Sequence, residues 1–265
     1  MRNKEEIAKK QAVYISHLMT DATTFINSID KTDIQTILLS GSIARGDFYP
    51  GKFGGMIDLT VMKNNGSTLT PESLFGKDEE PDIPYHCITV NKTHFQILFL
   101  EYIDYKAFQI FDEPRKFAFL ESKILWDKDN RFNNELQIIE KYARIDQNKQ
   151  LSSCLGYIDY LLSDYKKDRW YRREAFNQMH ENLNTSIRLM IQCLYYINSS
   201  YAPAEDRRLY YSYSLNKLPQ NYEGNINELF KQDILSEEDY FRREKLFYKK
   251  FLDFVNQNRP TTAST

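Results

Sequence analysis

A short segment rich in glycine and serine, followed by an acidic residue on the next predicted strand, is the part of the sequence best suited to chemistry. The segment reads Gly41-Ser42-Ile43-Ala44-Arg45-Gly46 and follows an apolar run at residues 36–40. The acidic residue is Asp58, in Ile57-Asp58-Leu59-Thr60-Val61. A strand that ends in Gly-Ser and opens a helix presents backbone N–H groups and a hydroxyl where phosphate oxygens bind. The pattern predicts a triphosphate site with Mg²⁺ on the Asp58 carboxylate.

Each residue of this segment has an expected role. Gly41 would let a phosphate approach the backbone closely. Ser42 would cap the helix and donate a hydrogen bond to phosphate, and Arg45 would neutralise charge from one turn further on. Gly41, Ser42 and Arg45 are therefore the predicted nucleotide-binding residues, and Asp58 is the predicted metal-binding and catalytic residue. The chain contains neither a G-x-G-x-x-G loop nor a phosphate loop ending in Gly-Lys-Ser/Thr, which argues against those two nucleotide-binding classes.

This pattern resembles the signature of the nucleotidyltransferase superfamily, whose members share the fold of DNA polymerase β. That signature is Gly-Ser-x-Ala-Arg-Gly, a variable loop, and then Ser-Asp-Ile-Asp-Leu. The first block matches at every specified position, and the second reads Gly55-Met56-Ile57-Asp58-Leu59. Residues 124–129 are similar to the family's Leu-Tyr-Asp-Lys/Arg-Asp strand and turn. The resemblance implies Mg²⁺-dependent transfer of a nucleoside monophosphate from an NTP to a hydroxyl of a small-molecule or protein acceptor.

The C-terminal half carries a second, weaker resemblance. Residues 194–198 (Leu-Tyr-Tyr-Ile-Asn), Tyr201, Pro203 and the segment Leu215 to Pro219 are similar to the helical domain of aminoglycoside- and lincosamide-type nucleotidyltransferases. Aromatic helices with a proline break are common in other proteins, so this match identifies no acceptor.

The expected set of metal-binding carboxylates is incomplete. Family members carry two carboxylates on alternate residues of one strand, which places both on one face, and a third on a neighbouring strand. Here Met56 occupies the first position and Gln96 the third, which leaves Asp58 alone. A thioether and a neutral amide are poor substitutes for a Mg²⁺-binding carboxylate. Three alternatives remain open: a substitute carboxylate such as Asp47 or Glu101, slow catalysis with one Mg²⁺, or a catalytically inactive nucleotide-binding or partner-docking relative, a pseudoenzyme.

Several other polar groups have both a functional and a structural interpretation. Arg173 and His180 are seven apart on a predicted helix, close to a spacing found in a family of helical RNases, but we expect a surface arginine and a half-buried histidine instead. His86 and His94 flank a predicted hairpin, and we expect a cross-strand pair rather than a metal site. The basic, aromatic stretch at residues 166–173 could stack a nucleobase, although such stretches are mostly solvated helix surface.

Composition limits the remaining classes. The chain has 265 residues, of which 42% are hydrophobic and 27% charged, and its net charge of −2 provides no overall basic field to attract nucleic acid. Cys87, Cys154 and Cys193 are far apart without metal-ligand spacing, so we expect buried reduced thiols. Neither a secretory signal nor an apolar run of membrane-spanning length is evident, which predicts a cytoplasmic protein.

Hydrophobic periodicity predicts an α+β protein, in which a half with strands and helices is followed by an all-helical C-terminal domain. The resemblance implies that the first half is a small mixed β-sheet flanked by helices. The expected domains are residues 1–130 and 131–257, with a flexible tail at 258–265, and the helical domain is expected to complete a cleft. Expected strands of the first domain are 36–40, 56–62, 86–90 and 95–101, and its expected helices are 5–28, 71–75 and 114–125. Expected helices of the second are 135–145, 151–165, 173–198, 206–218 and 237–254.

Overall fold

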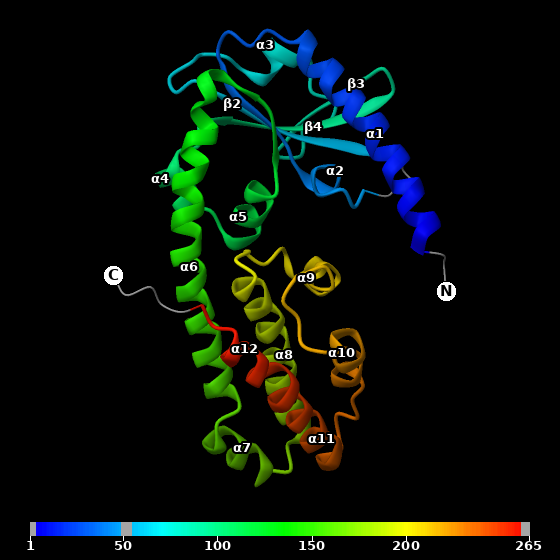
Figure 1. Cartoon of the computed structure of the whole chain (residues 1–265), viewed down its shortest axis with the longest axis vertical. Coiled ribbons are helices and arrows are strands. Elements are labelled where there is room, and N and C mark those ends of the chain that lie inside the picture. Colours follow the sequence, from blue (N-terminus) through cyan, green and yellow to red (C-terminus); the bar gives the residue numbers. More distant parts are fainter. Residues whose placement is uncertain (1–3, 49–54, 261–265) are drawn as a thin grey trace. The chain divides into compact units, whose positions relative to one another are not determined.

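The structure is a computed structural model that describes residues 4–48 and 55–260. The chain forms two compact units, residues 1–140 and 141–265, and the boundary falls within the long helix α6 (Arg131–Leu161) (Figure 1). Residues 49–54, which belong to the variable loop between the two blocks of the motif, and residues 261–265 of the predicted tail lie outside the described residues.

The first unit is built on a five-stranded mixed sheet in the order β3-β4-β2-β1-β5. Its strands are β1 (Ile34–Leu39), β2 (Met56–Lys63), β3 (His86–Val90), β4 (Thr93–Glu101) and β5 (Lys123–Asp127). Strands β2 and β4 are parallel, whereas the β1–β2, β1–β5 and β3–β4 pairs are antiparallel. This sheet, with its flanking helices and the helices that follow it, confirms the predicted α+β class.

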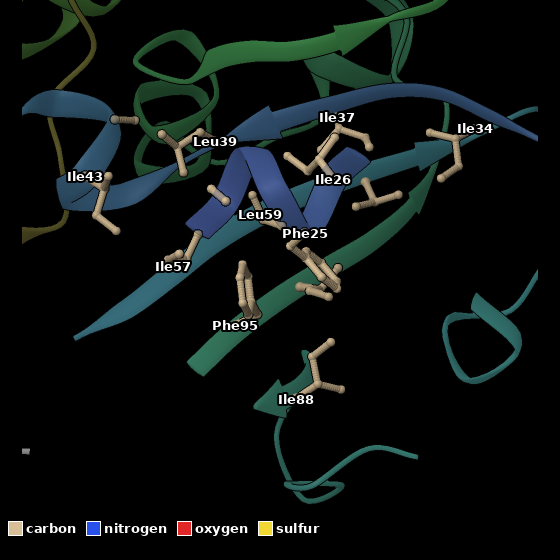
Figure 2. Close-up of a cluster of buried hydrophobic side chains, with 14 of the residues drawn as sticks. Phe25, Ile26, Ile34, Ile37, Leu39, Ile43, Ile57, Leu59, Ile88 and Phe95 are labelled. Atoms are coloured by element: carbon tan, nitrogen blue, oxygen red, sulfur yellow. The ribbon is translucent and has the colours of Figure 1, made fainter. Parts of the chain in front are cut away.

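Helix α1 (Lys4–Ser28) packs on one face of the sheet and forms the core there. Its residues Phe25 and Ile26 are buried with Ile57, Leu59 and Phe95 from the strands (Figure 2). The rings of Phe25 and Phe95 are 4.4 Å apart at their centroids. Because side chains alternate along a strand, the odd-numbered residues of β2 and β4 face α1, and Asp58 faces the other side.

The other helices of the first unit are short. They are α2 (Gly41–Arg45), α3 (Pro71–Phe75), α4 (Tyr105–Gln109), α5 (Glu113–Leu120) and the 3₁₀ turn η1 (Lys128–Asn130). The sequence predicts α3 but not α4, and the helix predicted at 114–125 ends earlier, at Leu120, because residues 123–127 pair with β1 as strand β5. The turn between β3 and β4 is the predicted one, and its residues Asn91 and Lys92 both have positive φ, 50° and 71°.

The second unit is helical, as predicted. Its elements are the rest of α6, α7 (Asp164–Tyr171), α8 (Phe176–Ile197), α9 (Glu205–Ser212), α10 (Tyr222–Phe230), α11 (Glu237–Phe247), the π-helical turn η2 (Tyr248–Leu252) and α12 (Asp253–Gln257). The break predicted near residues 146–150 was wrong: α6 continues through it, since the segment is polar but contains no Gly or Pro. The helix predicted at 206–218 ends earlier, at Ser212, and α10 was not predicted.

In the part of the chain that the structure describes, no helix is both long enough and apolar enough to cross a membrane. Cys87 and Cys193 are buried and Cys154 is partly exposed, and all three are reduced thiols.

Candidate functional site

The predicted Gly41 and Asp58 lie against each other where β1 ends. The Ser40 N–H donates to the Asp58 carbonyl at 2.8 Å, which continues the β1–β2 ladder up to the start of α2. Gly41 has a φ of +69°, and a β-carbon placed on it would lie 1.9 Å from Asp58 Oδ2. Position 41 therefore requires glycine for two reasons, its backbone conformation and the space that the Asp58 side chain occupies.

Ser42 does not cap the helix, so that part of the prediction was wrong. The cap of α2 is Ser40, whose extended backbone precedes the first turn and whose side chain makes no capping hydrogen bond. Ser42 lies within the turn, and its carbonyl accepts hydrogen bonds from the N–H groups of Gly46, Asp47 and Phe48 at 3.0–3.1 Å. Since α2 is only five residues long, its aligned peptide dipoles add little to an anion site.

The Ser40 hydroxyl instead belongs to a polar group behind Asp58. It lies 2.9 Å from the Ser122 hydroxyl and 3.3 Å from that of Thr60. The Ser122 hydroxyl also donates to the Ala118 carbonyl at 2.8 Å. These contacts tie the end of β1 to the end of α5 and fix the backbone on which Gly41 and Asp58 meet.

Arg45 lies within a small cluster of charges. Its Nε is 3.5 Å from Asp47 Oδ1, and its side chain is only 12% exposed. Glu121, which the sequence did not single out, belongs to the same cluster. Burial of its carboxyl raises the pKa of Glu121, Arg45 lowers that pKa and Asp47 raises it further. Glu121 follows α5 with no local motif around it, so only the tertiary structure reveals it.

The strand register defines the positions of the two replaced carboxylates. Gln96 pairs with Asp58 across the parallel β2–β4 ladder, and Met56 pairs with His94. By strand alternation, Met56, Asp58 and Gln96 share one face of the sheet. Met56 is 37% exposed, and Asp58 and Gln96 are partly exposed. On this face, a thioether and an amide are the immediate neighbours of the Asp58 carboxylate.

Glu101 is not a substitute for the missing carboxylates, so that alternative was wrong. It pairs with Lys63 in the β2–β4 register, five residues beyond the Asp58–Gln96 pair, and its carboxylate lies 3.2 Å from Lys63 Nζ. Five residues of strand span about 16 Å, and the odd spacing places Glu101 on the opposite face. The other candidate, Asp47, forms an ion pair with Arg45.

The histidine pair predicted across the hairpin does not form. His86 pairs with Ile97 and is buried beside Phe75, with ring centroids 5.8 Å apart. His94 pairs with Thr89 and faces the other side of the sheet. His94 instead lies beside Cys87 and Glu80. One potential ligand atom from each of these three residues lies within 4.8 Å of the other two. The spacing Cys87-x₆-His94 across a tight hairpin was the signal that could have revealed this group.

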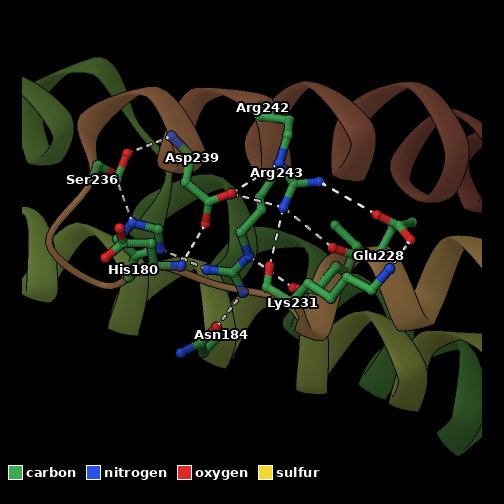
Figure 3. A network of polar contacts seen from close by, with 10 residues as sticks. His180, Asn184, Glu228, Lys231, Ser236, Asp239, Arg242 and Arg243 are labelled. Atoms are coloured by element: carbon green, nitrogen blue, oxygen red, sulfur yellow. Dashed lines mark hydrogen bonds and ion pairs between the residues drawn. The ribbon is translucent and has the colours of Figure 1, made fainter.

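In the second unit, His180 and Arg173 are not brought together. His180 is fully buried: its Nδ1 lies 2.6 Å from Arg243 Nη1, and its Nε2 lies 3.0 Å from the Ser236 carbonyl (Figure 3). Arg173 is exposed and donates to the Arg169 carbonyl at 2.6 Å. A buried network of this kind positions helices, and the RNase interpretation is not supported.

The basic stretch at residues 166–173 is largely paired with neighbouring groups. Lys167 lies 2.8 Å from Glu244, Arg172 lies 2.8 Å from Asp168, and Lys166 lies over the Tyr160 ring at 4.4 Å. The guanidinium groups of Arg169 and Arg173 lie 5.3 and 5.8 Å from the centroid of the Trp170 ring. These contacts favour the structural interpretation, a helix surface with local ion pairs.

Comparison with known proteins finds no matching family model and no matching curated protein. Among solved structures, the chain is similar to a crystal structure of a nucleotidyltransferase-like protein from Exiguobacterium sibiricum 255-15, determined at 1.90 Å resolution. The match has a TM-score of 0.40 and 8% sequence identity, and it covers 92% of this chain and 72% of that chain.

Proposed function

We propose that the first unit binds a nucleoside triphosphate, with the phosphates near Gly41, Ser42 and Arg45 and one Mg²⁺ on Asp58. The observation that supports this proposal is the contact between Gly41 and the partly exposed Asp58 carboxylate at the end of β1. A conformationally free backbone, a hydroxyl, a guanidinium and a carboxylate at one strand end are the groups that a metal–triphosphate complex needs.

The carboxylates present fit one Mg²⁺ rather than two. Mg²⁺ is commonly held by one or two carboxylates together with substrate phosphates and water, and Asp58 meets that minimum. A two-metal site requires acidic ligands shared between ions about 3.5–4 Å apart. Met56 and Gln96 provide none, and Glu101 lies on the wrong face and too far along the strand. When bound, Mg²⁺ would offset phosphate charge and so favour departure of pyrophosphate.

The reaction we propose for this site is slow nucleotidyl transfer. The oxygen of an acceptor hydroxyl attacks the α-phosphorus, the bond from that phosphorus to its bridging oxygen breaks, and pyrophosphate leaves with the bonding electrons. The acceptor hydroxyl loses its proton to solvent or to a base other than Asp58. Without a second metal to activate this hydroxyl, we expect a rate lower by on the order of 10³-fold than that of a complete site. The acceptor is a small molecule or a protein, since the net charge of −2 does not attract nucleic acid.

A second candidate is nucleotide binding without chemistry. The observation that favours it is the register of Met56 and Gln96 around Asp58, because both replaced side chains occupy the face that a metal would share. In this case the same residues bind the nucleotide as a ligand or a signal for a partner.

Calorimetric titration of ATP, GTP, CTP and UTP, with and without Mg²⁺, tests the shared premise. The variants are Asp58→Ala and, as a matched control, Asp82→Ala, which removes an exposed carboxylate from a loop of the same unit. We expect binding of at least one nucleotide that requires Mg²⁺, persists in Asp82→Ala and is lost in Asp58→Ala. Absence of binding for all four nucleotides, or full binding by Asp58→Ala, would show that this is not a metal–nucleotide site.

A further inference from the structure

Three potential metal ligands converge beside the β3–β4 hairpin, on the same face of the sheet as Asp58. Cys87 comes from β3, His94 from β4 and Glu80 from the loop before β3. Their sulfur, nitrogen and oxygen atoms all lie within 4.8 Å of one another. We propose that Glu80, Cys87 and His94 bind a divalent cation of the zinc class, with one coordination position left for water.

The strand register places the sulfur and the imidazole together. Cys87 pairs with Gln96 and Thr89 pairs with His94, so Cys87 and His94 are diagonal neighbours on one face of the hairpin. His94 Nε2 lies 3.7 Å from Glu80 Oε1. Tetrahedral zinc bonds of about 2.0–2.3 Å separate ligand atoms by roughly 3.3–3.8 Å, so small side-chain rotations would complete the geometry. The Glu80 side chain is 54% exposed and free to make such a rotation.

The loop that carries Glu80 is fixed to β3. One oxygen of Asp78, Oδ1, accepts hydrogen bonds from the N–H groups of both Glu80 and Cys87, each at 3.0 Å. The Glu79 N–H donates to the Cys87 carbonyl at 2.8 Å. These hydrogen bonds hold the backbone of Glu80 beside β3, so the approach of Glu80 to Cys87 does not depend on side-chain flexibility alone.

A hydrogen-bond chain orients the imidazole for metal binding. The Thr89 hydroxyl donates its single proton to Glu79 Oε2 at 2.7 Å, and His94 Nδ1 lies 3.4 Å from the same hydroxyl oxygen. Because that hydroxyl proton is committed to the carboxylate, Nδ1 must be the donor to Thr89. The neutral ring then carries its lone pair on Nε2, the nitrogen that faces Glu80. Metal-binding histidines are commonly oriented by an outer partner of this kind.

The charges around Cys87 favour a cation. Burial raises the pKa of the Cys87 thiol, and the carboxylates of Glu80, Asp78 and Glu79 raise it further. The negative charge of these three carboxylates, close to the Cys87 sulfur, would attract a dication. The combination of thiolate, imidazole and one carboxylate selects zinc over Mg²⁺ or Ca²⁺, which prefer oxygen ligands alone.

This site is separate from the Asp58 site. Cys87 and Asp58 both pair with Gln96, from opposite sides of β4, so they are two strands apart. Two strand spacings amount to about 10 Å, well beyond the separation of ions in a two-metal centre. A cation at Cys87 would join the loop at residues 78–80 to the hairpin, and its binding does not depend on the proposed nucleotide site.

The experiment is a zinc titration of the full chain, stripped of metal with a chelator and kept reduced, in competition with a chromophoric chelator. We expect one equivalent to bind. Thr89→Val removes an outer partner and should lower zinc affinity by roughly 10- to 100-fold. Cys87→Ser and His94→Gln each remove a ligand and should lower zinc affinity by more than that. Matched controls are Cys154→Ser and His17→Gln, which remove a thiol and an imidazole elsewhere and should bind zinc like the wild type.

Two further measurements make the result decisive. Co²⁺ in place of zinc should give a thiolate-to-metal charge-transfer band that Cys87→Ser lacks. Zinc should raise the Tm of the wild type and of Asp58→Ala, but not that of His94→Gln, whose partly exposed side chain can be replaced without disturbing the core. The proposal is wrong if the wild type binds zinc no more tightly than His94→Gln and Thr89→Val do. This comparison decides the question even if Cys87→Ser does not fold.

Discussion

The backbone of Gly41 lies directly against the carboxylate of Asp58. A β-carbon at position 41 would lie 1.9 Å from Oδ2 and 2.9 Å from Cγ of Asp58, both shorter than any van der Waals contact. The position of the one carboxylate proposed to hold Mg²⁺ is therefore set by the absence of a side chain at residue 41. The glycine of the sequence motif acts here through a neighbouring side chain as well as through its own backbone.

Gly41→Ala should displace Asp58 and weaken nucleotide binding, and Gly46→Ala is the matched control. Gly46 also has a positive φ, +84°, but no atom of the described residues lies within 4 Å of its added β-carbon. Backbone strain alone should make Gly46→Ala less stable by about 1–2 kcal/mol. Gly41→Ala should cost about 2–4 kcal/mol in urea denaturation and lower Mg²⁺-dependent NTP affinity by about tenfold or more. Equal effects of the two substitutions would show that the Gly41–Asp58 contact has no such role.

Restoring acidic side chains beside Asp58 should raise transferase activity. Met56→Asp with Gln96→Glu places carboxylates at the two positions that share a face with Asp58. If the site performs weak nucleotidyl transfer, pyrophosphate release from NTP should increase by about 10- to 10³-fold, because a second metal could then bind. Adding Asp58→Ala to the double variant should abolish the gain. Unchanged release with intact nucleotide binding would favour the binding-only alternative.

Most of the fold is predictable because its signals are local. The apolar run at residues 36–40 and the alternating pattern from Met56 correspond to β1 and β2, and the turn-forming Asn91-Lys92 joins β3 to β4. Local signals fail where an element depends on its surroundings. Helix α10 carries a single buried stripe between Tyr222 and Leu229, and its first residue follows Asn221, which has a φ of +54°.

The candidate site is only partly predictable, since register and tertiary contacts decide it. The sequence indicates that Asp58 and Gln96 lie on neighbouring strands, and the structure places them in register. Which serine caps α2 depends on where β1 ends, and the strand ends one residue earlier than the predicted run. His86 and His94 differ by an even number of residues, yet the turn of the hairpin places them on opposite faces.

Arg243 should be essential for the stability of the second unit. Its side chain is fully buried and donates to the Leu229 carbonyl at 2.7 Å and to Asn184 Oδ1 at 2.6 Å, in addition to its contact with His180 (Figure 3). Arg243→Met leaves the Leu229 carbonyl and the buried His180 imidazole without their donor and should lower the free energy of unfolding by about 3–5 kcal/mol.

The matched control for Arg243 is its neighbour Arg242, whose side chain is 43% exposed. Arg242→Met removes a partly exposed ion pair with Asp239 and should cost about 1 kcal/mol or less in the same urea denaturation. Similar losses for Arg242→Met and Arg243→Met would contradict a structural role for the buried network.

Buried tyrosines should make the fold sensitive to alkali. Burial is the main cause that raises the pKa of Tyr222 from 10.0 to about 12, and its hydroxyl lies 2.7 Å from Ser212 Oγ. A raised pKa in the folded state means that this contribution to stability is complete below pH 10 and is lost as pH rises toward 12. A two-unit difference corresponds to about 2–3 kcal/mol. Tyr222→Phe should therefore make the unfolding free energy fall less steeply between pH 10 and 12. Urea denaturation at a series of pH values measures this slope. The control Tyr210→Phe, at an exposed position, should leave the slope unchanged. An identical slope in wild type and Tyr222→Phe would show that ionisation of Tyr222 does not destabilise the folded state.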